Sequence, residues 1–317
     1  MSSTLRHDGL APTEPDLRPG SVAVGISTAA DAGYERSLRA AGEWAARRHV
    51  DVKLVVGLGH EPSPAHPDDP RPRFALAEID RAADHLTLQL DPHQRIHTSV
   101  RHDSAVDALL DESAKAGLLV LQRRRLGPLA RLRAGSTTAV VAANAACPVL
   151  IVHADDPIPG PPNDGGSVLV GVDQRGHGER AIAEAFEEAS WRGVCLTALM
   201  VWAPLGPTFV PPDDLEIDAG RTACRAQLAE QLAGYRDRYP DVAVHELVLA
   251  GEPEPVLADL SRSHELLVVA RHTEGHRARR NLGAVTRRII EEAHCPVLVT
   301  PTSRPAQVRR HRQTADQ

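Results

Sequence analysis

The sequence predicts two consecutive α/β domains of the same kind, each built on a five-stranded parallel sheet with helices on both faces. Two observations support this. The chain of 317 residues contains one unit twice: CPVLIV at 147–152 returns as CPVLVT at 295–300, and Gly135 returns as Gly283, both 148 residues later. In each unit, apolar segments of strand length alternate with segments of helical period, which is typical of parallel sheets buried between helices.

The first unit follows a polar, proline-rich segment, 1–18, that we expect to be disordered. Its expected strands are 22–26, 52–58, 95–100, 118–121 and 149–152. After the first strand, four apolar residues fall on one face of a helix: Tyr34, Leu38, Ala41 and Ala45. Three further helices are expected, at 73–88, around 106–110 and at 135–146, the last of which begins with Gly-Ser-Thr.

The second unit repeats this order. Its expected strands are 168–172, 196–202, 243–249, 266–270 and 297–300. The apolar face of its first helix is formed by Ile182, Ala185, Phe186 and Ala189. Proline and glycine dominate 155–166, which we interpret as a linker, and 303–317 is a polar tail that we expect to be disordered. The predicted domains are therefore 19–154 and 167–302.

Composition excludes several classes of function. A formal net charge of −6 and an aromatic content of 3% argue against a general nucleic-acid binder. We find no signal-peptide core and no apolar run long enough for a membrane helix, so we expect a cytoplasmic protein without a membrane partner. The four cysteines form no CxxC pair, and Cys147 and Cys295, which each open an apolar strand, are expected to be buried.

Several short motifs recur in this order in both units. They are the strand–glycine opening, which is followed by an aspartate at 168–173, the helix starts at Gly135-Ser136 and Gly283, and the two CPVL endings. Together they resemble the universal stress protein family in its tandem form, over 19–153 and 167–301. The resemblance implies an adenine nucleotide alpha hydrolase-like fold, doubly wound, with strand order 3-2-1-4-5.

The resemblance also implies where a nucleotide would bind. Family members that bind ATP use an aspartate after the first strand, and they wrap the phosphates with Gly-x-x-Gly, nine residues and Gly-Ser/Thr. Glycines allow backbone amides to approach a phosphate closely, and the helix that follows attracts anions to its N-terminus. In sheets of this kind, ligands also bind beyond the carboxyl ends of the first and fourth strands.

The first unit keeps the spacing of this pattern and loses much of its chemistry. Gly25 ends the first strand, but Ser27 occupies the aspartate position. Gln122 and Arg125 replace the two early glycines, whereas Gly135, Ser136 and Thr137 are retained at the helix start.

The second unit retains a different part of the pattern. Gly171 and Asp173 follow the family pattern, but Ala270 and Thr273 replace the early glycines before Gly283-Ala284 and Thr286. Gly251 follows the third strand of the unit, and Trp202 ends its second strand, where it either flanks an adenine or packs as an ordinary aromatic. Asp173 also has two interpretations: it either binds a ligand or caps the loop or the helix that follows.

Neither unit has the complete set, so we expect ATP binding to be weak or absent. Both altered loops are cationic, with Arg125 in one and Arg271 in the other. Guanidinium groups can hold a phosphate or another anion, and the alternative is solvated surface charge.

No nucleophile elbow or P-loop occurs, and His272 and His276 lie in an expected loop, so we expect neither a catalytic site nor a metal. The leading hypothesis is a non-enzymatic stress-response protein that acts through an unidentified protein partner. The alternative is an ATP sensor with one working site in the second domain, and an ATP-cleaving enzyme ranks last.

The duplication predicts how the two domains meet. As the resemblance implies, 148–152 and 296–300 are edge strands that pair antiparallel, and joining two units makes this pairing intramolecular. We also expect two tandem chains to form a homodimer.

Overall fold

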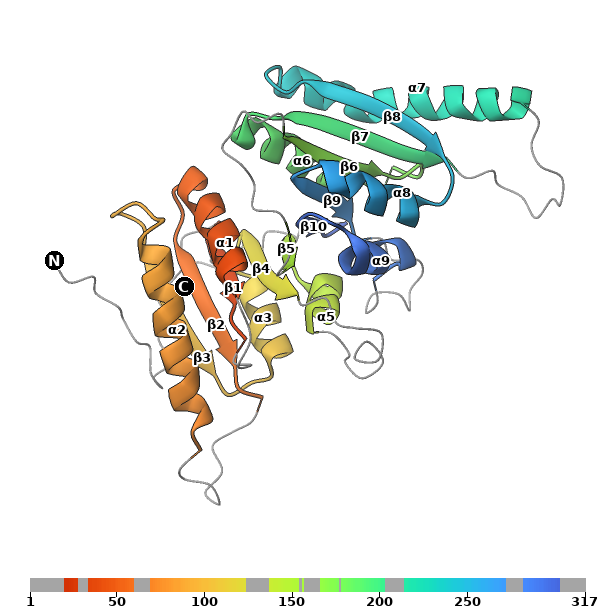
Figure 1. Cartoon of the computed structure of the whole chain (residues 1–317). Helices are drawn as coiled ribbons and strands as arrows, with labels where there is room; N and C mark the ends of the chain where they lie inside the picture. The colour runs from red at the N-terminus through yellow and green to blue at the C-terminus, as the bar shows by residue number, and fades with distance from the viewer. Residues whose placement is uncertain are drawn as a thin grey trace, which may run out of the picture.

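A computed structural model describes residues 20–27, 34–59, 69–123, 137–153, 156, 166–176, 178–202, 214–271 and 282–302. The first domain contains β1 (Val22–Gly25), α1 (Glu35–Arg48), β2 (Val52–Gly57), α2 (Arg71–Thr87), β3 (Ile96–Arg101), α3 (Ala105–Ser113), β4 (Leu118–Arg123), α5 (Thr137–Asn144) and β5 (Val149–His153). The second contains β6 (Ser167–Val172), α6 (Glu179–Arg192), β7 (Cys195–Trp202), α7 (Asp214–Arg238), β8 (Val244–Ala250), α8 (Pro253–Leu260), the short 3₁₀ helix η1 (Ser261–Ser263), β9 (Leu266–Ala270), α9 (Ala284–Glu292) and β10 (Val297–Thr300) (Figure 1).

All ten strands form one sheet, in the order β3-β2-β1-β4-β5-β10-β9-β6-β7-β8. Each half is parallel and has the predicted order 3-2-1-4-5. The halves meet at β5 and β10, which pair antiparallel with Leu298 opposite Leu150 and Val299 opposite Val149. The predicted pairing of the fifth strands is thus confirmed, and the mirrored strand order relates the two halves by an approximate twofold axis.

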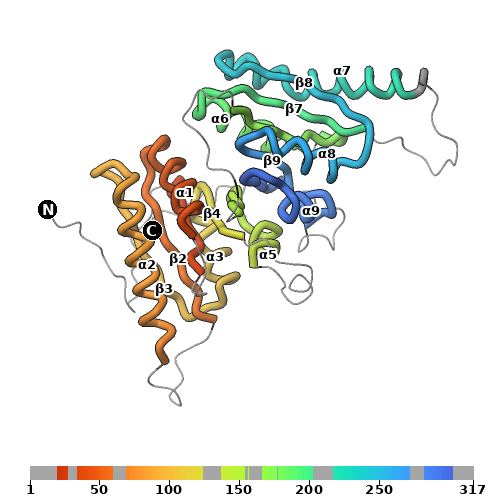
Figure 2. Tube along the Cα trace, viewed as in Figure 1, coloured from red at the N-terminus to blue at the C-terminus, as the bar shows by residue number. Residues whose placement is uncertain are grey.

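Two hydrophobic layers cover the faces of this sheet. One layer packs α1, α2, α6 and α7 on one face, and the other packs α3, α5, α8 and α9 on the opposite face. Both layers continue from one domain into the other, so the chain folds around two long cores rather than two separate pairs of cores. Figure 2 traces the chain through both halves, in the same view as Figure 1.

The buried helix faces follow the predicted pattern. The apolar residues expected on α1 and α6 are all buried, and Phe186 of α6 stacks on Tyr235 and Tyr239, with ring centroids 5.5 and 5.7 Å apart. Most observed helix and strand ends lie within two residues of the expected ones. The apolar period of the sequence did not predict where α7 begins and ends. This helix has 25 residues, whereas its counterpart α2 has 17.

The cores of the two halves differ at one buried pair. Lys53 of β2 and Glu112 of α3 form an ion pair at 2.9 Å with almost no exposure of either side chain. The matching sheet register and the 148-residue repeat place Thr197 and Leu260 at these positions in the second domain. The first half therefore buries two charges where the second half buries none.

A buried carboxylate joins α1 to α6 across the two domains. Glu188 of α6 accepts hydrogen bonds from the Trp44 indole at 2.9 Å and from the Arg48 guanidinium at 3.0 Å, both on α1. Arg192, one turn further along α6, donates to it at 3.1 Å. The Arg48 guanidinium also lies 3.9 Å from the centre of the Trp44 ring, so it contacts both partners at once.

Candidate functional site

The glycines that end the first strand of each half have a packing role. Gly25 of β1 is opposite Leu121 of β4, and a Cβ atom on Gly25 would lie only 2.8 Å from the Leu121 Cδ2. At Gly171 of β6, a Cβ would lie 3.3 Å from a methyl carbon of Leu257. A side chain at either glycine would have to displace a leucine methyl group, so both positions are tightly packed.

The loop that carries Asp173 is held by α7. Gln231 donates to the main-chain oxygen of Asp173 at 3.2 Å, and Gln227 donates to that of Gln174. Tyr235 donates to the main-chain oxygen of Glu179, at the start of α6, at 3.0 Å. Asp173 itself is half-buried and follows the end of β6, and the loop is held through its backbone. In the first half, Ser27 is exposed at the corresponding place.

Trp202 packs against a helix at the end of β7. Its ring lies on Gly220 of α7, where a Cβ would come within 2.6 Å of the indole. Its main-chain oxygen accepts from the amide of Gly251 at 3.0 Å, and Gly251 has a φ of 140°, which favours glycine. These contacts support the packed-aromatic interpretation of Trp202 and give Gly251 a conformational reason.

The positions that replace the first family glycine belong to the sheet. Gln122 is part of β4 and pairs with Val152, and Ala270 is the last residue of β9 and pairs with Thr300. The Thr286 hydroxyl donates to the main-chain oxygen of Ala270 at 3.2 Å, which ties α9 to the end of β9. Gly283 is the N-cap of α9.

In the first half, Thr137 begins α5 and is exposed. Arg125, Gly135 and Ser136 lie outside the described residues, as do Thr273, His272 and His276. The predicted nucleotide residues that the structure describes in the second half therefore form two groups. Gly171, Asp173, Arg271, Gly283 and Thr286 lie around the ends of β6 and β9, and Trp202 and Gly251 lie at the ends of β7 and β8.

Two equivalent arginines contact the opposite domain. Arg271 follows β9, and its Nη1 donates to the main-chain oxygen of Ala145, just after α5, at 2.9 Å. Arg123, which the 148-residue repeat equates with Arg271, ends β4 and lies 3.5 Å from the Glu291 carboxylate on α9. Each therefore reaches the C-terminal end of the last helix of the other half, where the helix dipole favours positive charge.

Sequence reasoning missed Arg180, at the start of α6. Burial, followed by the charge of Arg180, lowers the pKa of Arg271. The nearest carboxylate to Arg180 is that of Glu184 at 3.6 Å, and its Nη1 is buried without a hydrogen-bond partner in the part of the chain that the structure describes. Arg180 corresponds to Arg36 of α1. The repetition of an arginine 144 residues apart, at the start of both helices, is the sequence feature that could have identified it.

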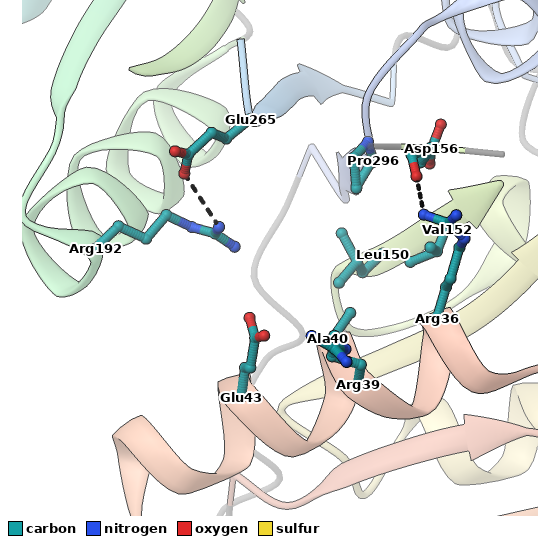
Figure 3. Close-up of a pocket in the computed structure, with 10 residues that line it drawn as sticks. All are labelled: Arg36, Arg39, Ala40, Glu43, Leu150, Val152, Asp156, Arg192, Glu265 and Pro296. Carbon is teal, nitrogen blue, oxygen red and sulfur yellow. Dashed lines mark hydrogen bonds and ion pairs between the residues drawn. The ribbon is translucent and has the colours of Figure 1, made fainter. Parts of the chain in front are cut away.

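A cavity of about 40 Å³ lies between the domains on the α1 side of the sheet (Figure 3). Three arginines and three acidic residues balance its charge, and two of the arginines have carbonyl or carboxylate partners: Arg192 lies 3.9 Å from Glu265, and Arg36 donates to the main-chain oxygen of Asp156. Its lining includes none of the predicted nucleotide residues. The lining residues are Arg36, Arg39, Ala40, Glu43, Leu150, Val152, Asp156, Arg192, Glu265 and Pro296.

The described residues can also be compared with the requirements for a metal site and for a membrane-spanning helix. Among them, no group of three or more His, Cys, Asp and Glu side chains is arranged to hold a metal ion. None of the helices within those same ranges combines the length and the apolar character needed to cross a membrane.

The model of the universal stress protein family matches the chain twice, over residues 21–153 and 166–301. The chain belongs to the universal stress protein family. The two matches coincide with the two halves of the sheet, so this universal stress protein is of the tandem form.

Relatives with the same family name occur in mycobacteria. A universal stress protein of Mycolicibacterium smegmatis is 37% identical over 205 residues, which are 64% of this chain and 68% of the relative. One from Mycobacterium tuberculosis is 30% identical over 274 residues, 82% of this chain and 91% of the relative. A solved universal stress protein structure from Archaeoglobus fulgidus has the same fold, with a TM-score of 0.63 at 13% identity, covering 89% of this chain and 96% of that one.

Proposed function

We propose that this tandem universal stress protein is a non-enzymatic stress-response protein that acts through a protein partner, and that its nucleotide loops are degenerate. ATP binding is weak or absent in this proposal. The observation that carries it is the pair Arg123 and Arg271. Both arginines contact the opposite domain, so these two cations at the ends of β4 and β9 are already used to hold the domains together.

Other contacts support the same proposal. Trp202 packs on α7, and the Thr286 hydroxyl is bonded to the sheet. Gln122 and Ala270 lie within the ladder of the sheet, where glycine would otherwise release backbone amides toward a phosphate. Arg123 and Arg271 at these strand ends carry no acceptor and cannot act as a general base for ATP cleavage, which agrees with the non-enzymatic proposal.

The alternative is an ATP sensor with one working site in the second domain. It is favoured by Asp173, which follows the end of β6, and by the adjacent charges of Arg180 and Arg271 near the start of α9. In such a site Asp173 would hold the adenine or ribose end of the nucleotide. The two arginines and α9 would face the phosphates, or another anion.

The deciding experiment is to denature the purified protein, assay the supernatant for released nucleotide, and titrate the native protein with ATP and Mg²⁺ by calorimetry. We expect no released nucleotide and a Kd weaker than about 1 mM. Stoichiometric nucleotide would instead establish the sensor if it is lost in Asp173→Ala but kept in the matched variant Asp218→Ala, which changes an exposed side chain on α7. Phosphate release above the blank would contradict the non-enzymatic proposal.

We also propose a cytoplasmic location and a homodimer of tandem chains. The composition and the family support the location, and the positions of β3 and β8 at the two ends of the sheet are compatible with further assembly. Light scattering coupled to size-exclusion chromatography tests the dimer: a mass of one chain at micromolar concentration would contradict it.

A further inference from the structure

His153 is a buried histidine at the contact between the two domains. It is the last residue of β5 and has no solvent exposure. Its Nε2 lies 2.8 Å from the main-chain oxygen of Ile290 in α9, and its Nδ1 lies 3.3 Å from the Oδ2 of Asp156, which is 2% exposed. The same Asp156 oxygen accepts the His153 amide at 2.7 Å. One ring thus contacts a carboxylate on its own side and a helix of the other domain.

Both partners of the ring are acceptors. The Ile290 carbonyl belongs to the last turn of α9, where helix carbonyls lack a partner four residues ahead, so Nε2 has to donate. The Asp156 Oδ2 can accept a hydrogen bond from Nδ1, and the Oδ1 of the same buried side chain has no hydrogen-bond partner among the described residues, so the ring is the group placed to offset the charge of this carboxylate. A neutral imidazole carries one N–H and would turn a lone pair toward one of these oxygens, whereas the imidazolium donates to both.

The geometry points to His153 as a buried imidazolium that joins the two domains, which makes their pairing sensitive to pH. The C-terminal end of α9 adds a second favourable interaction, since the negative end of a helix dipole stabilises a cation. In the other half, the guanidinium of Arg271 contacts Ala145 after α5 in the corresponding way. A histidine can lose its charge as the pH rises, whereas the guanidinium of Arg271 cannot.

The other charged groups around His153 are paired with partners of their own. Arg123 of β4 is its neighbour in the sheet and is paired with Glu291 of α9 at 3.5 Å, so these two charges offset each other. Arg36 of α1 donates to the main-chain oxygen of Asp156 and leaves the carboxylate to the ring.

Two further titratable groups approach from the second domain. Burial, followed by the charge of Asp156, raises the pKa of the Cys295 thiol, which stays neutral. Arg192 of α6 is paired with Glu188 at 3.1 Å. The carboxylate of Asp156 is therefore the direct counter-charge of the ring.

The direction of the pH effect follows from proton linkage. In the proposed state the folded protein keeps the second proton of His153 at a pH at which an unfolded histidine, with its ordinary pKa of about 6.5, has released it. As the pH rises through neutrality the native state binds more protons than the open state, so the stability of the domain contact falls. The contact is strongest at mildly acidic pH and loosens in alkaline solution.

The protonation state is tested directly by NMR of protein labelled with ¹⁵N-histidine. The His153 ring is assigned by its absence in His153→Gln, and the ring nitrogens of the wild type are then followed from about pH 6 to about pH 9. We expect both nitrogens of His153 to be protonated at neutral pH. A neutral ring in the native protein at neutral pH would overturn the proposal.

The effect on the domains is tested by hydrogen exchange of the β5 and β10 amides, corrected for the intrinsic pH dependence of exchange. In the wild type the opening constant should rise with pH by up to about tenfold per unit, the limit for one proton. His153→Gln can still donate to Ile290 but cannot be charged, so this pH dependence should disappear.

The matched control is His49→Gln, because His49 is 77% exposed and 3.3 Å from Asp91. It should keep the wild-type dependence. If His153→Gln does not fold, Asp156→Asn removes the counter-charge and should flatten the same profile. An unchanged pH dependence in either folded variant would overturn the proposal.

Discussion

At the scale of single residues, Glu188 shows how this molecule buries charge between its domains. Burial alone would raise the pKa of this carboxyl, but Arg192 and Arg48 outweigh it and hold the pKa below its ordinary value. The carboxylate therefore stays ionised and bonded to both guanidinium groups. Removing it would leave two arginines and the Trp44 indole without their shared acceptor.

We expect Glu188→Gln to destabilise the protein by about 3–5 kcal/mol at neutral pH, because the neutral amide no longer offsets the charges of the largely buried guanidinium groups of Arg48 and Arg192. The exposed neighbour Glu187, which is 41% exposed and 3.3 Å from Arg48, is the control. Its replacement by Gln should cost at most about 1 kcal/mol. Urea unfolding of the three proteins gives these differences, and equal costs for both variants would contradict the assignment.

The same comparison has a pH dependence. Because the folded pKa of Glu188 is lowered, its contribution is fully present above the ordinary glutamate value of about 4.3 and is lost as the pH falls through the folded value. The difference between wild type and Glu188→Gln should therefore be constant from neutral pH down to that range and then shrink.

The candidate site was only partly predictable at this scale. The positions of Gly171, Asp173 and Gly283 in the sequence identified them, because they directly follow or precede helices and strands. It did not reveal that Arg271 contacts Ala145 or that Trp202 lies on Gly220, because these partners are distant in sequence. A single sequence gives the chemistry of a side chain, and only the fold decides which partner that side chain meets.

At the scale of elements, the fold was largely predictable. The buried surfaces follow from the apolar period of α1 and α6 and from the continuous apolar strands. Because the unit occurs twice, each helix or strand predicted in one half is supported by its counterpart in the other. The length of α7 was not accessible in this way, since it has 25 residues and no strong apolar face at its start. The β5–β10 contact followed from the family resemblance and from the need to cover an edge strand.

Leu298→Lys should open the β5–β10 contact. Leu298 is 3% exposed and lies opposite Leu150, so a lysine there would bury an unpaired charge at a cost of at least about 3 kcal/mol. Small-angle scattering should show a larger radius of gyration. Leu88→Lys, at a position that is 89% exposed, is the control and should leave the radius unchanged. An unaltered radius in folded Leu298→Lys would refute this prediction.

At the scale of the whole molecule, the two continuous hydrophobic layers predict one cooperative unit. Phe186→Ala removes a ring with no exposure from the second half, and we expect a loss of about 3–5 kcal/mol. Because the layers cross the β5–β10 contact, a single calorimetric transition should move to lower temperature as a whole.

The control is Phe74→Ala, since Phe74 on α2 is 44% exposed. It should shift the transition much less. Two separate transitions, of which only one is displaced in Phe186→Ala, would show that the halves unfold independently.

The ten-stranded sheet with its internal twofold has a consequence for mutation. In a symmetric dimer of single domains, every substitution is made in both copies at once, and a residue on the axis has to suit its own duplicate. In this chain each half mutates alone, as the Lys53–Glu112 pair and its uncharged counterpart Thr197–Leu260 illustrate. One half is therefore free to lose a ligand, change its charges or acquire a titrating histidine while the other half preserves the shared architecture.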